Sequence, residues 1–218
     1  MAFSGGEELT GMILRSMPIG EYDRRVEILT REKGKISAFA RGSRKPGSPL
    51  MASASPFVFG RFRVFFGRSS NQLLSAQVQN YFETLRADIT ATCYGSYFME
   101  ILEYCTAENM DADALLILGY QALRALSSEK FDNRLVRGIF EIKAVMLEGE
   151  FEAPDPDKYL PATIHALHFL WDTPPAKVYS FGVSEEVLRE LLQIAGRLRK
   201  RTFPHHFQSL DILEVVAK

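Results

Sequence analysis

The pattern of apolar and polar residues divides the chain into a part with short alternating runs and a part with helical spacing. Before about residue 80, the runs alternate as β-strands do and are separated by clusters of Gly, Pro and Ser. The predicted strands are residues 12–15, 26–30, 36–41, 57–66 and 73–78. Five such strands fit a small closed barrel.

The breaks between these strands predict two different loops. The break at 31–35 is short and contains Gly34, which can take the positive φ that a hairpin loop needs. The break at 42–49 is polar and rich in Gly, Ser and Pro, so it predicts an exposed and mobile loop.

From about residue 85 onward, apolar residues recur every three or four positions, which predicts helices. Three stripes are expected to bury one another: Phe98, Ile101, Leu102 and Cys105; Leu115, Leu116, Gly119, Ala122, Leu123 and Leu126; Leu135, Ile139, Ile142 and Met146. Breakers at 152–157 interrupt the pattern, helical spacing returns at 164–171, and Ser184 is expected to cap a last clear helix. The prediction is an α+β protein, with a barrel domain at 1–82 and an all-helical domain at 83–218.

The charge distribution separates the same two parts. Net charge is −1 overall, but residues 1–80 carry +6 and residues 81–218 carry −7. A basic module joined to an acidic one favours a nucleic-acid partner at the basic end. The absence of a long apolar run and of a signal-peptide pattern predicts a cytoplasmic protein that does not contact a membrane.

The sequence contains no pattern that predicts catalysis or a cofactor. Phosphate-binding Gly loops and nucleophile motifs are absent. Cys93 and Cys105 fall on one predicted helix, too far apart for a disulfide, and the four histidines have no third ligand nearby. We therefore expect no enzyme activity, no cofactor and no metal.

Basic and aromatic residues of the barrel half indicate a nucleic-acid surface. In the fourth strand, alternation places one set on the outer face: Phe57, Phe59, Arg61, Arg63 and Phe65. Rings that stack on bases beside guanidiniums that meet phosphates are typical of single-strand binders. The equally weighted alternative is that Phe57 and Phe59 pack under the helical domain while Arg61 and Arg63 only face water. Further cations stand at Arg24, Arg41, Arg44, Lys45 and Arg68.

Several motifs resemble the RecO family of recombination mediators. The sequence Thr-Arg-Glu-Lys-Gly-Lys at 30–35, followed by Ala-Arg-Gly-Ser-Arg-Lys-Pro-Gly-Ser at 40–48, is similar to the family signature. Pro-Phe-Val-Phe-Gly at 56–60, Phe-Glu-Ile-Lys at 140–143 and the segment 209–213 also match family motifs. The resemblance runs along nearly the whole chain.

This resemblance implies an N-terminal OB-fold and a non-catalytic role in recombinational repair. Family members bind single- and double-stranded DNA, anneal strands, and work with RecR to load recombinase onto strands coated by single-strand-binding protein. The resemblance also implies a bacterial, nucleoid-associated protein, and it carries DNA contacts onto Lys35, Arg41, Arg44 and Lys45. Arg24, Arg61, Arg63 and Arg68 come from charge and alternation alone. The alternative function is a scaffold whose barrel binds a polypeptide, and an enzyme acting on nucleic acid ranks last because the barrel's acids do not cluster.

Two expectations concern the helical half. Many relatives carry paired cysteines after the Phe-Glu-x-Lys helix, but residues 149–155 contain none, so the zinc module is expected to be absent near 149–160. We expect Arg134 and Arg137 to flank an apolar groove lined by Leu135, Ile139 and Met146, and the family resemblance supplies the acidic tail of single-strand-binding protein as the partner that would fit there. The alternative, at least as strong, is that both arginines pair with acids such as Asp132 and Glu141.

Overall fold

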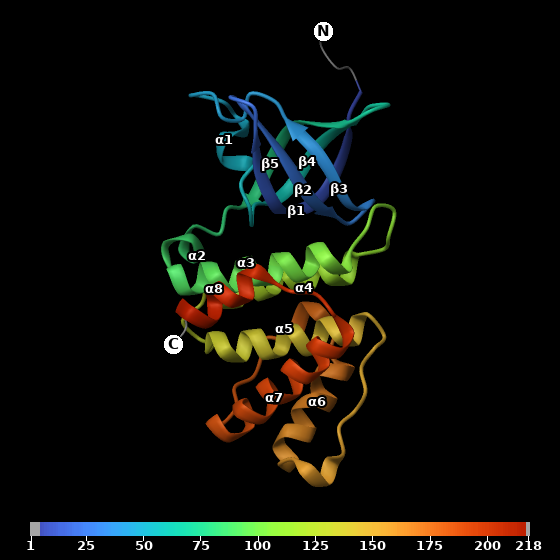
Figure 1. The fold of residues 1–218 in the computed structure, drawn as a ribbon, viewed down its shortest axis with the longest axis vertical. Helices are drawn as coiled ribbons and strands as arrows, with labels where there is room; N and C mark the ends of the chain where they lie inside the picture. Colours follow the sequence, from blue (N-terminus) through green and yellow to red (C-terminus); the bar gives the residue numbers. More distant parts are fainter. Residues whose placement is uncertain (1–4, 217–218) are drawn as a thin grey trace. The chain divides into compact units, whose positions relative to one another are not determined.

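A computed structural model describes residues 5–216 and contains a closed β-barrel followed in the chain by helices (Figure 1). The predicted α+β fold class, an OB-fold barrel and a helical domain, is confirmed. The chain forms two compact units, which we describe separately. The barrel unit contains the residues up to Glu83 together with Met99–Leu116, and the helical unit contains Thr84–Phe98 and the residues from Ile117 onward.

Five strands and one short helix build the barrel. They are β1 (Glu7–Ile19), β2 (Asp23–Thr30), β3 (Gly34–Ala40), α1 (Leu50–Ser53), β4 (Phe59–Phe66) and β5 (Asn71–Asn80). Their order around the barrel is β1-β2-β3-β5-β4, and only the β3–β5 pairing is parallel. All five predicted strands are present, most of them longer than predicted, whereas α1 was not predicted.

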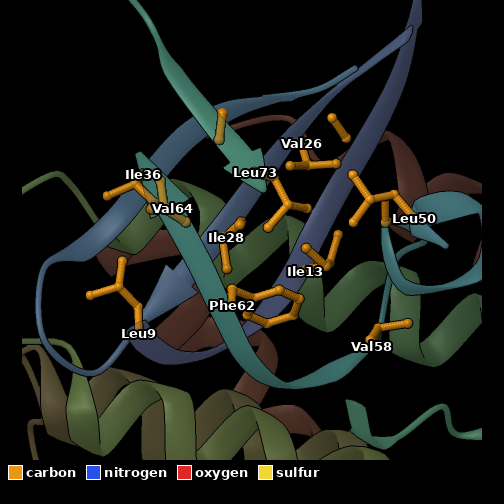
Figure 2. Close-up of a cluster of buried hydrophobic side chains, with 13 residues drawn as sticks. Leu9, Ile13, Val26, Ile28, Ile36, Leu50, Val58, Phe62, Val64 and Leu73 are labelled. Carbon is orange, nitrogen blue, oxygen red and sulfur yellow. The ribbon is translucent and has the colours of Figure 1, made fainter. Parts of the chain in front are cut away.

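Alternate side chains of the strands fill the barrel interior (Figure 2). Because successive residues of a strand point to opposite faces, one set becomes core and the other meets solvent. In β4 the buried set includes Phe62 and Val64, as the alternation predicted. Phe57 departs from the prediction. Its φ of 70° is not an extended conformation, so β4 begins only after it, and its side chain is buried rather than on the outer face.

The end of the third helix and the segment after it complete the barrel unit. The Lys35 amide donates to the Ala107 carbonyl at 3.0 Å, and the Asn109 amide donates to the Lys33 carbonyl at 2.9 Å. Gly34 has the predicted positive φ, 65°, and a Cβ there would lie 2.3 Å from the Ala107 oxygen. Glycine is therefore required at this position for the turn and for the close approach of the second backbone.

The remaining elements are seven helices and two single 3₁₀ turns in the described residues. The helices are α2 (Glu83–Ala87), α3 (Ile89–Cys105), α4 (Asp113–Leu126), α5 (Asn133–Leu147), α6 (Pro161–Asp172), α7 (Glu185–Thr202) and α8 (Gln208–Val216). The 3₁₀ turns are Pro156–Lys158 and Pro175–Lys177. The predicted stripes are buried apart from half-buried Met146, and the Ser184 hydroxyl accepts the Val187 amide as the expected N-cap. Within residues 5–216 no helix is both long and apolar enough to cross a bilayer.

The Phe-Glu-x-Lys motif of α5 holds the helical unit together. Phe140 stacks on Phe98 with 4.2 Å between ring centroids. Glu141 is 1% exposed and accepts hydrogen bonds from the Tyr97 hydroxyl at 2.5 Å and from Arg137 Nε at 3.0 Å. Lys143 Nζ donates to the Leu170 carbonyl at 2.6 Å, so a cation caps the carboxyl end of α6.

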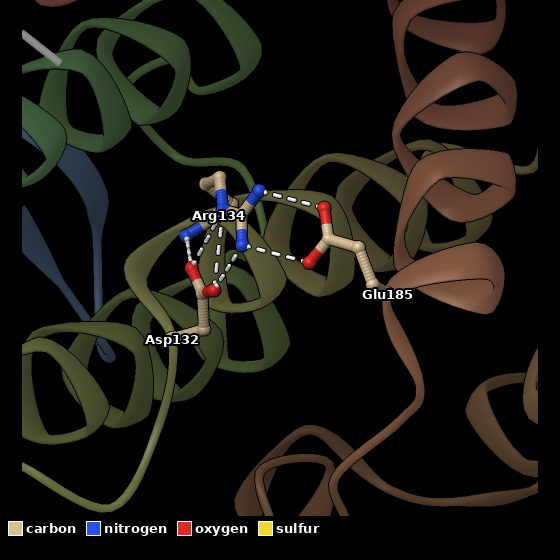
Figure 3. Close-up of polar contacts among 3 residues, drawn as sticks. All are labelled: Asp132, Arg134 and Glu185. Carbon is tan, nitrogen blue, oxygen red and sulfur yellow. Dashed lines mark hydrogen bonds and ion pairs between the residues drawn. The ribbon is translucent and has the colours of Figure 1, made fainter. Parts of the chain in front are cut away.

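Arg134 forms a second, exposed ion-pair network at the start of α5 (Figure 3). Its guanidinium donates to Asp132 at 2.7 Å and to Glu185, in the first turn of α7, at 2.9 and 3.0 Å. Asp132 also caps α5 by accepting the Arg134 amide. The network links the beginnings of two helices, but it lies in solvent, where ion pairs contribute little.

We expect Glu141→Ala to lower the free energy of unfolding by about 3–5 kcal/mol, because it leaves the buried Arg199 guanidinium and Tyr97 hydroxyl, and the half-buried Arg137, without their carboxylate partner. Arg134→Ala should cost no more than about 1 kcal/mol. Urea denaturation of the two variants and the parent measures both values. Equal losses would contradict the distinction between a buried and an exposed network.

Candidate nucleic-acid interface

The loop after β3 is anchored to the turn between β1 and β2. The Gly42 amide donates to Asp23 Oδ1 at 2.7 Å, and the Arg44 amide donates to the Tyr22 carbonyl at 2.9 Å. The Arg44 guanidinium reaches the Gly20 carbonyl at 3.1 Å. The loop is exposed as predicted except at Ser43, which is buried, and these contacts, which were not predicted, anchor the loop at one end of the barrel.

Three cations of this loop are exposed: Arg41, Arg44 and Lys45. Among residues 5–216, none of the ion pairs within 4.0 Å involves Arg41, Arg44 or Lys45. Arg24 lies at the same end, half-buried, and donates to the Met51 carbonyl at 2.7 Å. The anchored loop therefore presents positive charge that the chain does not neutralise locally.

The outer face of β4 carries the other predicted arginines. Arg61 and Arg63 are both exposed, and Phe59 and Phe65 on the same face are half-buried. Arg61 pairs with Glu8 of β1 at 3.3 Å. Arg68 is exposed in the turn between β4 and β5. This face combines rings and guanidiniums as predicted, but part of its charge is paired.

Lys35 lies in a different environment from the loop cations. Its ammonium group donates to the Glu103 carbonyl. Lys35 pairs with Leu29 near one end of the β2–β3 ladder, whereas the Arg24–Ala40 pair, next to the basic loop, lies at the other end. Arg15 forms an ion pair with the Glu103 carboxylate at 3.3 Å. The structure thus separates Lys35 from Arg41, Arg44 and Lys45, with which the sequence motif had grouped it.

Sequence reasoning did not single out Tyr22, the aromatic residue of the β1–β2 turn. Its side chain is 43% exposed, and Lys45 Nζ lies 5.2 Å from its ring centroid. Ile19 and Met51, at the same end of the barrel, are also exposed apolar residues. The only signal in the sequence was an aromatic residue two positions after Gly20, in the segment that connects two predicted strands.

The groove expected along α5 is closed. Arg134 binds Asp132 and Glu185, Arg137 binds Glu141, and Ile139 is fully buried. The alternative, that both arginines pair with neighbouring acids, describes the observed contacts. Ile139 offers no surface to a partner in this arrangement.

The segment at 149–160 does not fit a zinc site. Within residues 5–216 no three His, Cys, Asp or Glu side chains gather as metal ligands would. Side-chain contacts hold the segment: the Arg201 guanidinium donates to the Glu152 carboxylate and to the Glu150 carbonyl, and the centroids of the Phe151 and Trp171 rings are 5.6 Å apart. A pocket of about 490 Å³ opens here between Phe151, Pro156 and Trp171, and it too was not predicted.

Comparison with known proteins matches both parts of the chain to one family. The family model described as Recombination protein O N terminal matches residues 6–82, and that described as Recombination protein O C terminal matches residues 86–151. Proteins called DNA repair protein RecO are similar: that of Alkaliphilus metalliredigens is 31% identical over 139 residues, 64% of this chain and 56% of that protein. That of Bacillus pumilus is 34% identical over 64% of this chain and 54% of its own length. That of Acetivibrio thermocellus is 26% identical over 95% of this chain and 96% of its own length. The matched region thus spans little more than half of the first and second of these proteins and nearly all of the third.

The Lys35 region also contains two neighbouring carboxyl groups, which makes stability depend on pH. Burial, and then the nearby Glu103 carboxylate, raise the pKa of Glu27 above its usual 4.5, although Lys35 and Arg15 oppose the shift. A carboxyl group whose pKa is higher in the folded state binds its proton more tightly there, so stability falls as pH rises above about 4.5.

We expect Glu27→Gln to match the parent in free energy of unfolding near pH 4 and to exceed it at pH 7. Urea denaturation at both pH values tests this, with Glu129→Gln, an exposed carboxylate in a turn, as the control. A difference from the parent that is the same at both pH values would contradict the proposed origin.

Proposed function

Because the chain belongs to the RecO family of DNA repair proteins, we propose that its barrel unit binds DNA chiefly through Arg41, Arg44 and Lys45. The observation that carries this proposal is that three exposed cations without an ion pair to any described residue gather on one anchored loop, whereas Arg63 and Arg68, which are exposed and likewise outside the ion pairs, lie apart from one another on β4 and in the turn after it. Several other cations of the barrel unit are paired. Arg15, Arg31, Lys33 and Arg61 each have a carboxylate within 4.0 Å. Unpaired cations can neutralise phosphates without first leaving an acidic partner.

The anchoring of the loop supports the same role. Its backbone is held by Asp23 and by the carbonyls of Gly20 and Tyr22, so little order must be gained on binding. Phosphate contacts of this kind do not read base sequence. Arg24, Arg63 and Arg68 extend the basic surface, while Lys35 and Arg61 contribute less because each already has a partner within the chain.

Membership of the family supports a wider role, which we include in the proposal. The protein acts as a recombination mediator that binds single and double strands, promotes their annealing, and works with RecR in loading recombinase onto strands covered by single-strand-binding protein. This role needs no catalytic group, cofactor or metal. The closed groove on α5 means that we do not assign the tail of single-strand-binding protein to Arg134 and Arg137.

We expect Arg44→Ala combined with Lys45→Ala to weaken binding of all DNA sequences alike. Each lost phosphate contact should reduce the slope of log affinity against log salt by about 0.7 for single strands, so the double variant should flatten it by roughly 1 to 1.5. Fluorescence anisotropy of labelled oligonucleotides over a salt series measures the slope.

The matched control is Arg31→Ala combined with Lys33→Ala, which removes the same charge from the β2–β3 loop, where both cations are paired. Circular dichroism checks the fold of each variant. Unchanged affinity and slope in the Arg44/Lys45 variant would refute the proposed function. An equal loss of affinity in both variants would mean that the net charge of the protein, and not the loop, determines DNA binding.

A further inference from the structure

The basic end of the barrel also exposes three apolar side chains. Tyr22 is 43% exposed, Ile19 is 39% exposed and Met51 is 38% exposed. Ile19 pairs with Asp23 across the turn that contains Tyr22, and the Met51 carbonyl accepts a hydrogen bond from Arg24. Exposed apolar side chains beside cations form a surface that suits a ligand with both apolar and anionic parts.

The Tyr22 ring is held next to this positive charge. The Tyr22 backbone carbonyl accepts a hydrogen bond from the Arg44 amide at 2.9 Å, and Lys45 Nζ lies 5.2 Å from the centroid of the Tyr22 ring. The acids of this turn are Glu21, whose carboxylate accepts a hydrogen bond from the Tyr22 hydroxyl, and Asp23, which accepts the Gly42 amide. Against these two carboxylates, four cations belong to this end of the barrel, and Lys45 is the one measured next to the ring: Arg24, Arg41, Arg44 and Lys45.

Resting on the proposed DNA binding, we propose that Tyr22 stacks on a nucleobase and makes the barrel prefer single-stranded to duplex DNA. Both forms of DNA present phosphates, and the loop cations meet either. Only a single strand presents an unpaired base face to a ring beside its backbone. Duplex bases are stacked on each other, so Tyr22, Ile19 and Met51 would remain unused on a duplex.

The test measures the affinity of the full-length protein for a labelled oligo-dT and for a hairpin duplex with the same number of phosphates. Losing one base–aromatic stack weakens single-strand binding by roughly 5- to 150-fold. We expect this loss in Tyr22→Ala for the single strand, with the duplex affinity within about twofold of the parent and the salt slope unchanged, since no phosphate contact is removed. Tyr22→Phe should keep the parent's preference because the ring remains.

Tyr104→Ala is the matched control, because Tyr104 is also 43% exposed in the barrel unit but adjoins Glu103, which contacts Lys35 at the other end of the β2–β3 hairpin. A second readout uses Tyr22→Trp together with Trp171→Phe, which leaves one tryptophan at the proposed stacking position. We expect its fluorescence to be quenched by oligo-dT more than by the duplex.

The outcomes separate this proposal from the one on which it rests. If the Arg44/Lys45 variant loses DNA binding but Tyr22→Ala binds both forms of DNA as the parent does, stacking is refuted and the DNA-binding proposal stands. The exposed apolar side chains would then be assigned to the docking of a polypeptide. A parallel loss on single strand and duplex in Tyr22→Ala also refutes stacking. If the Arg44/Lys45 variant binds as the parent does, the DNA-binding proposal fails, and the stacking proposal with it.

Discussion

Two residue pairs, Ala38 with Asn71 and Phe39 with Gln72, close the barrel. They form the short parallel seam between β3 and β5, reinforced by the Asn71 side-chain amide, which donates to the Ser37 carbonyl at 3.0 Å. Without this seam the sheet would have two open edges, whose unpaired backbone groups would be available to other chains. Closure also fixes the ends of the barrel. Because Arg24 pairs with Ala40, the chain must leave β3 beside the β1–β2 turn, and the basic loop is formed there.

The charges of the chain divide according to their surroundings. Glu141, fully surrounded by protein, has a hydroxyl and two guanidiniums facing it, because an isolated buried carboxylate is very unfavourable. Arg134 satisfies two carboxylates at the surface, where the energetic gain is small. Arg41, Arg44 and Lys45 remain exposed with no ion pair to any residue of the described range, which costs little in stability. Their positions are therefore set by backbone hydrogen bonds, and their charges stay available.

Local patterns were sufficient to predict the strands and the long helices, but not the short helices α1 and α2. Alternation located the strands, spacing of three to four residues located the long helices, and the Ser184 cap and the conformation of Gly34 followed from single residue types. Contacts between distant residues were not predictable. Nothing near Lys35 indicates that its ammonium meets residue 103, and nothing near Arg134 indicates Glu185. The Phe-Glu-x-Lys motif was visible, but not that Glu141 is buried, and the exposure of Tyr22 depends on how two loops meet.

The barrel unit is discontinuous in sequence, and this has a consequence for how it is made. The contacts of Lys33, Gly34 and Lys35 require the backbone at residues 107–110, so they cannot form while the ribosome has released only the five strands. Synthesis from residue 83 to residue 116 takes about 2 to 7 s at ordinary translation rates. During that interval the nascent barrel lacks the segment that covers its β2–β3 hairpin. The stretch between, Thr84–Phe98, belongs to the helical unit, so the first part of the helical unit is synthesised before the barrel unit is complete.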